Sequence, residues 1–225
     1  MHDACLKIKI LDFGVMDFGA SFAIQEQLVE ALFGGMETET LLLLEHMPVY
    51  TMGRGGSEDN ILDAAIEPVR INRGGDVTFH GPGQLVGYPI IDLDMRGRDL
   101  HRYLRFLEEL LIRVAADYAV EARRVTGRTG VWTGKGKLAS IGVGVRRWIT
   151  MHGFALNVST DLAGFSAINP CGIEACPVTS LKDLLGTAAP AMQEVKAAVM
   201  KYFEPLLDEC LPVLTNRAAG KALHR

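Results

Sequence analysis

Hydrophobic residues follow two different spacings along this chain. From residue 99 to residue 118 they recur every three or four positions, with Leu100, Leu104 and Leu107 in one stripe, as on the buried face of a helix. Shorter apolar runs such as residues 85–92, with several β-branched members, are typical of buried strands. We expect further strands at residues 6–10, 40–45, 69–72, 120–126, 138–145 and 149–158, and further helices at residues 21–33, 180–185 and 191–207. This alternation predicts a mixed α/β fold.

The chain has no internal repeat and no linker that would divide it. Its 225 residues fit one large domain, which we expect to span residues 1–212, followed by a loose polar and basic tail at residues 213–225. The most apolar runs are far shorter than the ~18 residues that a membrane span requires, and the N-terminus does not resemble a signal peptide. We therefore expect a cytoplasmic protein.

Charge and cysteine content exclude several classes of protein. The net charge is −4 and the isoelectric point about 5.9, so the chain lacks the general positive field of a nucleic-acid-binding protein. Cys5, Cys171, Cys176 and Cys210 are too sparse for the disulfide framework of a small secreted protein, and we expect reduced thiols. The C-x4-C pair at 171 and 176 has no second cysteine or histidine pair beside it, so we expect no metal.

Cys171 lies between Pro170 and Gly172, neither of which belongs inside a helix or a central strand. This setting indicates a thiol presented on a loop. The alternative is a small buried hydrophobic residue, the commonest fate of a free cysteine. If Lys137, 34 residues upstream, folds back beside the sulfur, its ammonium would favour the nucleophilic thiolate.

Other residues compete for these two roles. Lys135 would point to the same face of a strand as Lys137, so periodicity does not separate them, although the run that follows Lys137 favours it. Cys176 is a second thiol but lacks the Pro-Cys-Gly setting. A pair of Cys171 with His80 or His152 would instead indicate a cysteine hydrolase.

Residues 73–84 form a glycine-rich segment at a place where a strand would otherwise continue. Adjacent glycines let the backbone approach a ligand closely, because no Cβ intervenes. The alternative is a tight hairpin connection with an exposed His80. The segment lacks the lysine-serine/threonine ending of a phosphate-binding P-loop.

Four segments, residues 73–84, 137–142, 150–157 and 170–172, occur in an order and at spacings that resemble a known family. The resemblance covers residues 45–180 and is to the lipoyl(octanoyl) transferases, which transfer octanoyl groups from acyl carrier protein to other proteins. It implies the mixed sheet flanked by helices of the class II aminoacyl-tRNA synthetase and biotin protein ligase catalytic domains. It also implies a covalent acyl-enzyme through Cys171 with Lys137 as its partner. The substrate-binding residues that it implies are Arg73, Gly74, Gly75, Asp76, Val77, Thr78, Phe79, His80, Ser140, Ile141, Gly142, Gly153, Phe154 and Ala155.

The chemistry of this reaction requires neither ATP nor a metal, because exchange of one thioester for another is nearly energy-neutral. The resemblance implies octanoyl-acyl carrier protein, with its phosphopantetheine arm, as donor. It implies lipoyl domains of 2-oxoacid dehydrogenases and the glycine-cleavage H protein as acceptors, with no nucleic acid, no membrane and a monomeric enzyme. Backbone N–H groups near Gly172 or the turn at Gly74 and Gly75 are candidate oxyanion donors, with His80 and Thr78 in support.

Two other functions fit parts of the pattern. An ATP-dependent lipoate or biotin ligase would share the implied fold but would not need Cys171. A non-catalytic acyl-binding protein would use the glycine-rich cleft only to hold a chain. Seven arginines either gather into a docking patch for acidic partner proteins or lie scattered over several faces: Arg102, Arg105, Arg123, Arg124, Arg128, Arg146 and Arg147.

Overall fold

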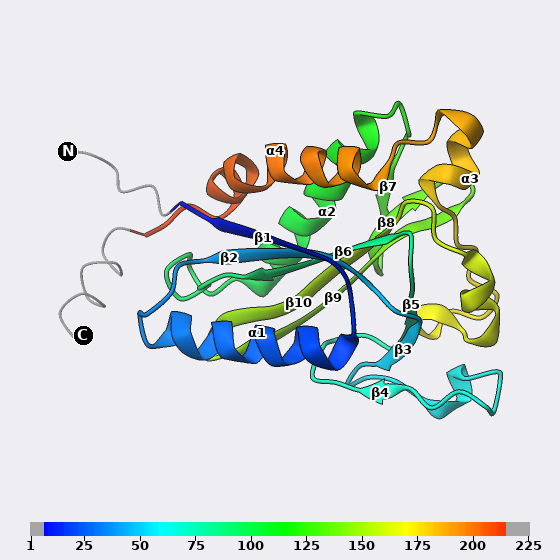
Figure 1. Ribbon diagram of the computed structural model, residues 1–225, viewed down its shortest axis with the longest axis horizontal. Helices are drawn as coiled ribbons and strands as arrows, with labels where there is room; N and C mark the ends of the chain where they lie inside the picture. The colour runs from blue at the N-terminus through cyan, green and yellow to red at the C-terminus, as the bar shows by residue number, and fades with distance from the viewer. Residues whose placement is uncertain (1–6, 215–225) are drawn as a thin grey trace.

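A seven-stranded sheet forms the centre of the computed structural model, which describes residues 7–214 (Figure 1). Its strand order is β1-β2-β6-β10-β9-β8-β7, and only β1 and β2 run parallel to one another. The bounds are β1 Lys9–Met16, β2 Thr40–His46, β6 Gln84–Ile90, β7 Arg123–Val125, β8 Arg128–Thr133, β9 Gly136–Arg146 and β10 Ile149–Asn157. Cys5 and residues 215–225 of the expected tail lie outside the described residues.

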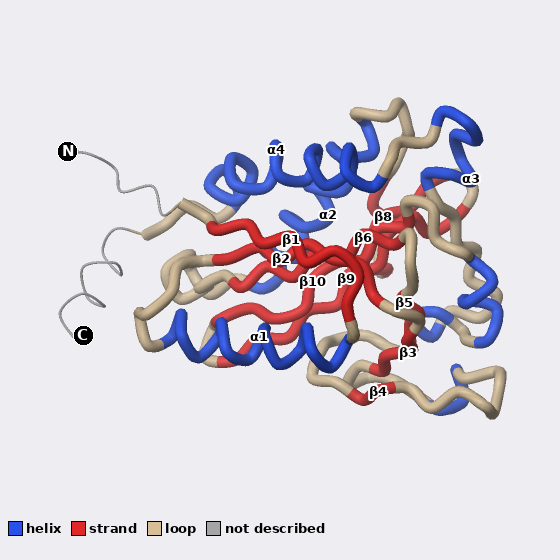
Figure 2. The backbone as a smooth tube through the Cα atoms, in the orientation of Figure 1, coloured by secondary structure: helices blue, strands red, loops and turns tan. Residues whose placement is uncertain are grey.

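Helices cover both faces of this sheet (Figures 1 and 2). Alternate residues of β2 show why: Leu41 and Leu43 pack with the residues of α2 and α4, whereas Leu42 and Leu44 pack with α1. Because both faces are covered, β2 is a continuous apolar run without alternation. The helices are α1 Phe18–Phe33, α2 Leu100–Ala116, α3 Leu181–Leu185 and α4 Met192–Cys210. Within residues 7–214, no helix combines the length and apolar character needed to cross a bilayer.

A second, three-stranded sheet lies at one end of the large one and has the order β4-β3-β5 (Figure 2). Its core contains Phe79 and Phe165, whose rings meet edge to face at 5.5 Å. The strands are β3 Val49–Met52, β4 Val69–Arg70 and β5 Val77–His80. Short 3-10 helices lie near them at η1 Glu58–Asn60, η2 Leu162–Ala167 and η3 Pro170–Gly172, while a fourth, η4 Gly186–Ala188, follows α3.

The expected mixed α/β fold is confirmed, but several bounds differ from the expectation. The first strand is β1, eight residues long, where we expected residues 6–10; it bulges at Gly14, which adopts a positive φ of 62°. The first helix begins at Phe18 because the Asp17 side chain caps it by accepting from the N–H of Ala20. The strands β3, β5 and β8 were missed; β5 lies inside the segment that we expected to be a turn, and β8 contains Gly130.

Candidate active site

Lys137 and Cys171 are in direct contact. The Nζ atom of Lys137 donates a hydrogen bond to the Sγ atom of Cys171 over 2.8 Å. Lys137 is the second residue of β9, and its backbone is bonded on both sides to the segment that follows the cysteine. Its N–H donates to the carbonyl of Pro177 over 2.8 Å, and its carbonyl accepts from the N–H of Thr179 over 3.0 Å. The same strand therefore carries the lysine and anchors the loop that carries the thiol.

The Lys137 side chain is buried without a carboxylate partner among the described residues. It is 2% exposed, and its Nζ atom lies 5.5 Å from the centre of the Trp132 ring, on the neighbouring strand β8. A cation over the face of an indole is stabilised by the ring's negative quadrupole. The lysine is thus held between an aromatic face and a sulfur atom.

Cys171 occupies an unusual backbone conformation. Its φ of 60° and ψ of 25° are left-handed, and Gly172 follows with a φ of 68°. A non-glycine residue in this region costs of order 1–3 kcal/mol and persists where its surroundings hold it. The expected thiol on a loop is confirmed, since Cys171 is half-buried at the centre of η3; the alternative of a fully buried cysteine is wrong.

The η3 turn is fastened to β5 through Asp76. The Nδ2 atom of Asn60 donates to Asp76 Oδ2 over 2.7 Å, and the carbonyl of Asn60 accepts from the N–H of Asn169 over 2.8 Å. A Cβ placed on Gly172 would lie only 3.0 Å from the same Asp76 oxygen. Asp76 therefore helps to hold the loop in position through Asn60. Because Asp76 lies so close to residue 172, a glycine fits there better than a residue with a side chain.

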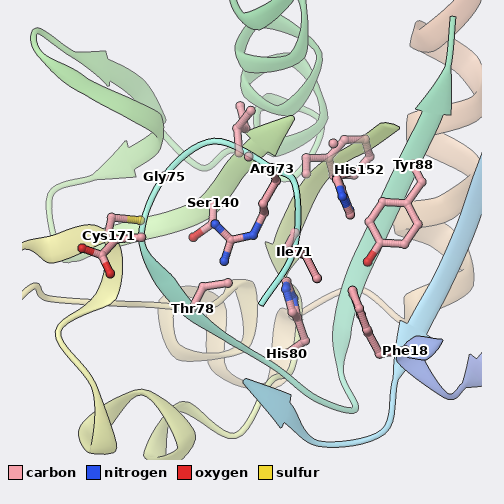
Figure 3. A pocket seen from close by; sticks show the side chains of 16 residues that line it. Phe18, Ile71, Arg73, Gly75, Thr78, His80, Tyr88, Ser140, His152 and Cys171 are labelled. Carbon is pink, nitrogen blue, oxygen red and sulfur yellow. The ribbon is translucent and has the colours of Figure 1, made fainter. Parts of the chain in front are cut away.

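A cavity opens beside the sulfur and encloses about 470 Å³, part of it open to solvent (Figure 3). Residues 140–142 of β9 and 153–155 of β10, which the resemblance implies as substrate-binding residues, form part of its wall. A second hollow, lined by Lys137, Arg128 and Gly74, also reaches Cys171 and shares Gly75 with the first. The thiol thus lies where two hollows meet.

The side chains of residues 76–80, which are β5 and the residue before it, alternate between the cavity and the core of the small sheet. Asp76, Thr78 and His80 line the cavity, whereas Val77 and Phe79 pack on the opposite side, in the core of the small sheet. This follows from the two-residue repeat of a strand. The structure therefore brings Asp76, Thr78 and His80 to the site and places Val77 and Phe79 away from it.

Arg73 brings a buried positive charge to the cavity. Its guanidinium donates from Nη2 to the carbonyl and hydroxyl oxygens of Thr51, over 2.7 and 2.9 Å, and from Nη1 to the carbonyl of Gly74 over 3.0 Å. Burial lowers the pKa of Arg73, while the nearby Cys171 sulfur acts in the opposite direction. No carboxylate forms an ion pair with Arg73 within residues 7–214. Its charge is therefore available to an anionic sulfur or oxygen in the cavity.

Three histidines lie in or beside the cavity and are held neutral. Burial lowers the pKa of His46 to about 4 and those of His80 and His152 to about 3. Each shares a 2.7 Å hydrogen bond with a neutral partner: His46 with Tyr88 Oη, His80 with Gln84 Oε1, and His152 with Asn72 Oδ1. His80 is buried, so the alternative of a hairpin with an exposed His80 is wrong.

The competing residues lie elsewhere. Lys135 donates from Nζ to the carbonyl of Asp183 over 3.2 Å and does not reach the sulfur. Cys176 contacts the carbonyl of Pro177, and burial raises the pKa of its thiol. Neither His80 nor His152 bonds to Cys171, so the geometry of a Cys–His hydrolase is not formed.

The model for the lipoyl protein ligase A/B catalytic domain matches residues 17–204 of this chain, a range that contains every residue of the site. An octanoyltransferase of Geobacter metallireducens is 65% identical to it over 205 residues, which cover 91% of this chain and 96% of the relative. The chain belongs to the lipoyl protein ligase A/B catalytic domain family.

Solved structures agree with this family in their fold. A bipartite lipoate protein ligase of Thermoplasma acidophilum superposes with a TM-score of 0.68 at 17% identity, covering 90% of this chain and 84% of that one. A biotin protein ligase of Aquifex aeolicus gives a TM-score of 0.53 at 14% identity, with 91% and 70% covered. The fold that the sequence resemblance implied, that of biotin and lipoate protein ligases, is confirmed.

The lipoyl protein ligase A/B fold also brings residues to the cavity that sequence reasoning missed. Phe18, Ile71 and Tyr88 line it, although none was among the expected substrate-binding residues. Tyr88 lies within residues 85–92, whose sequence predicts a buried strand. That sequence does not show which of its side chains line a cavity and which pack in the core. Phe18 had a usable signal, because Asp17 immediately before it is a favoured helix cap and predicts an earlier helix start.

Proposed function

We propose that this chain is an octanoyltransferase that moves an octanoyl group from acyl carrier protein to a lysine of a lipoyl domain, through a thioester on Cys171. The observation that carries the proposal is the 2.8 Å contact between Lys137 Nζ and Cys171 Sγ at the junction of two hollows. Family membership and relatives named octanoyltransferase support it.

The first half-reaction is the exchange of one thioester for another. The Cys171 thiolate, stabilised by the Lys137 ammonium in contact with it, attacks the carbonyl carbon of the donor thioester. A new carbon–sulfur bond forms, the bond to the phosphopantetheine sulfur breaks, and that sulfur takes a proton from the Lys137 ammonium and leaves as a thiol. The acyl chain occupies the cavity lined by residues 140–142 and 153–155. No nucleotide, metal or other cofactor takes part.

The second half-reaction forms an amide. The amine of an acceptor lysine attacks the thioester carbonyl, a carbon–nitrogen bond forms, and the Cys171 sulfur leaves. Lys137, left neutral by the proton transfer of the first half-reaction, accepts the proton that the attacking nitrogen loses, which restores the ammonium beside the Cys171 thiolate. The second hollow, lined by Lys137 and Arg128, admits first the donor arm and then the acceptor lysine. The acceptors are the lipoyl domains of 2-oxoacid dehydrogenases and the glycine-cleavage H protein, and the enzyme acts as a monomer.

The decisive experiment is the intact mass of the protein after incubation with octanoyl-acyl carrier protein and without ATP. A thiol-labile octanoyl adduct is expected on the wild type and on Cys176→Ser, but not on Cys171→Ser. Lys137→Ala should form the adduct at least ~100-fold more slowly, because general acid–base groups typically contribute about 10²–10⁴-fold. Lys135→Ala, two residues away but bonded to Asp183, should match the wild type.

An ATP-dependent lipoate ligase gives the opposite results. It would convert free octanoate and ATP into the acylated acceptor, it would retain activity as Cys171→Ala, and it would show no adduct with the carrier-bound substrate. A non-catalytic acyl-binding protein would bind the octanoyl carrier protein without becoming modified. Either result would remove the transferase mechanism.

A further inference from the structure

Thr78 carries a buried hydroxyl for which no described residue provides a hydrogen-bond partner. Within residues 7–214, four buried side-chain polar atoms have no hydrogen-bond partner, and of these only Thr78 Oγ1 belongs to a residue lining the cavity beside Cys171. The Thr78 side chain is 5% exposed, so water reaches it poorly. An unpaired buried hydroxyl is destabilising and therefore rare, and each case calls for an explanation.

The buried polar neighbours of Thr78 in the cavity wall are already paired. Arg73 donates to Thr51 and Gly74, His80 bonds to Gln84, and His152 bonds to Asn72. These side chains keep their hydrogen bonds whether or not a ligand is present. Thr78 differs from them because its hydroxyl is left free, which suits a donor reserved for an atom of the substrate.

Two of the backbone groups that the sequence suggested for this role are engaged elsewhere. The N–H of Gly74 donates to the carbonyl of Val143 over 2.8 Å, and the N–H of Gly172 donates to the carbonyl of Asn169 over 3.1 Å. Both amides are thus committed to the fold, which leaves the oxyanion in need of a donor from elsewhere in the cavity wall.

The position of Thr78 matches the position of the reacting carbonyl. Asp76, immediately before β5 and two residues before Thr78, is linked through Asn60 to the η3 turn that carries Cys171 and also lines the cavity. Figure 3 shows Thr78 between Cys171 and His80, below the end of the Arg73 side chain. A medium-chain acyl group has only one polar atom, its carbonyl oxygen, and that atom is bonded to the carbon that Cys171 attacks. A hydroxyl in this wall that bonds to the acyl group therefore has a single possible acceptor on it.

We infer that the Thr78 hydroxyl donates a hydrogen bond to the carbonyl oxygen of the acyl group and strengthens it as that oxygen becomes an oxyanion. This inference rests on the proposed acyl transfer. When the Cys171 sulfur adds to the carbonyl carbon, the π electron pair moves to the oxygen, and the Thr78 O–H stabilises it without giving up its proton. When the carbon–sulfur bond to the leaving thiol breaks, the pair returns and the carbonyl re-forms. Thr78 acts in the same way in both half-reactions.

The test compares Thr78→Val, which keeps the shape and removes the hydroxyl, with Thr78→Ser, which keeps the hydroxyl. Single-turnover acylation of Cys171 by octanoyl-acyl carrier protein should be about 10²–10³-fold slower in Thr78→Val, the usual loss for one oxyanion donor, and within about tenfold of wild type in Thr78→Ser. The thermal midpoint of Thr78→Val should equal or exceed that of the wild type, because an unpaired buried hydroxyl has been removed. A residue with only a structural role would not combine slower chemistry with undiminished stability.

A second readout follows the carbonyl itself. In an acyl-enzyme made with carbonyl-labelled octanoate, the infrared carbonyl band should move to higher frequency in Thr78→Val, because the hydrogen bond that weakens the C=O bond is lost. Wild-type acylation rates and an unshifted band in Thr78→Val would overturn the inference, with the acyl-enzyme itself still established. If Thr78→Val does not fold, Thr78→Ala decides by the same two readouts. A wild type that forms no thioester would refute the proposed function instead.

Discussion

Gly130 lies directly against the side chain of Lys137. A Cβ at position 130 would be 2.8 Å from Lys137 Cε and 3.5 Å from Nζ, and the glycine has a φ of 118°. A side chain on this β8 residue would crowd both the lysine that contacts Cys171 and the backbone oxygen of Ala139, which would lie 2.6 Å from its Cβ.

Gly130→Ala is therefore expected to displace the ammonium from the sulfur. We expect octanoyl transfer to Cys171 to slow at least ~10-fold, since small misplacements of reacting groups are costly, and the melting temperature to fall. The control is Gly127→Ala, which also has a positive φ, of 77°, but no atom within 4 Å of its Cβ position. Single-turnover rates of Cys171 acylation, measured for both variants well below their melting temperatures, show whether Gly130 is needed to position Lys137. Equal rates would show that the lysine does not depend on Gly130 for its position.

The central chemical pair could be predicted from the sequence because it lies in continuous motifs. Pro-Cys-Gly around Cys171 indicated a shaped loop, and the run after Lys137 separated it from Lys135. Other features depend on pairing between distant segments. The strand β5 has only four residues, and it forms because β3 lies beside it, with Thr51 opposite Thr78. Local sequence could not supply that partner, so the segment read as a turn.

The same limit explains the residues that were missed. Trp132 became a platform for Lys137 only through the pairing of β8 with β9, since the two residues lie opposite one another. The free hydroxyl of Thr78 is likewise a property of the packed structure, because it depends on which neighbours are already bonded. Sequence identifies residues able to donate, whereas the fold decides which donors are left without a partner.

The seven arginines divide into separate groups in the structure. Arg146 and Arg147 pair with Glu30 of α1, nine or more residues along β9 from Lys137, or roughly 30 Å. The other five lie on α2, β7 and β8; of these, Arg102, Arg123 and Arg128 form no ion pair within the described part of the chain. Of the seven arginines, only the five on α2, β7 and β8 are placed to attract an acidic carrier protein to the active site.

Charge reversal at Arg128 tests this docking role. Arg128 lines the hollow that contains Cys171 and Lys137, so Arg128→Glu should lower kcat/KM for octanoyl-acyl carrier protein about 3- to 10-fold at low salt, with a smaller effect at high salt. Arg147→Glu, at the far end of β9, is the control and should keep the wild-type value. A small octanoyl thioester without a carrier protein should be used equally well by all three proteins. A salt-independent loss shared by both donors would indicate damage to the site itself.

The buried histidines predict how stability depends on pH. His46, His80 and His152 have folded-state pKa values of about 4, 3 and 3, below the value of about 6.5 expected in the unfolded chain. The unfolded state therefore binds more protons below pH 6.5, and the free energy of unfolding falls as the pH drops from 6.5 toward 4. Each histidine contributes a slope of up to about 1.4 kcal/mol per pH unit.

Denaturant unfolding of the wild type and His46→Gln between pH 4 and 7 measures this contribution. Glutamine can still bond to the hydroxyl of Tyr88 but does not titrate, so the variant should lose stability less steeply with falling pH. The two curves should approach one another toward pH 4 and separate above it. Parallel curves across this range would mean that His46 is not held neutral by burial.

Asp76 lines the cavity and also fastens the cysteine loop, and two variants separate these roles. Its Oδ1 atom accepts from the N–H of Val77 over 2.6 Å and its Oδ2 atom from Asn60 over 2.7 Å, while Asn60 in turn accepts from the N–H of Asn169. Asn60 does not line the cavity that holds Cys171, so it can act only through position. If anchoring of the loop is what matters, Asn60→Ala and Asp76→Ala should both slow acylation of Cys171, by about 10-fold or more, because the strained cysteine backbone is no longer held.

The exposed Asp59→Ala, whose carboxylate bonds only to the neighbouring Ser57 hydroxyl, is the control and should act like the wild type. Acylation rates must be compared with melting temperatures, because loss of a charged hydrogen bond also lowers the free energy of unfolding by about 1–3 kcal/mol. A slow Asp76→Ala beside a normal Asn60→Ala would assign Asp76 a direct contact with the substrate. Slow rates in both would show instead that the geometry of the thiol depends on the Asp76–Asn60–Asn169 chain, which joins the small sheet to the nucleophile.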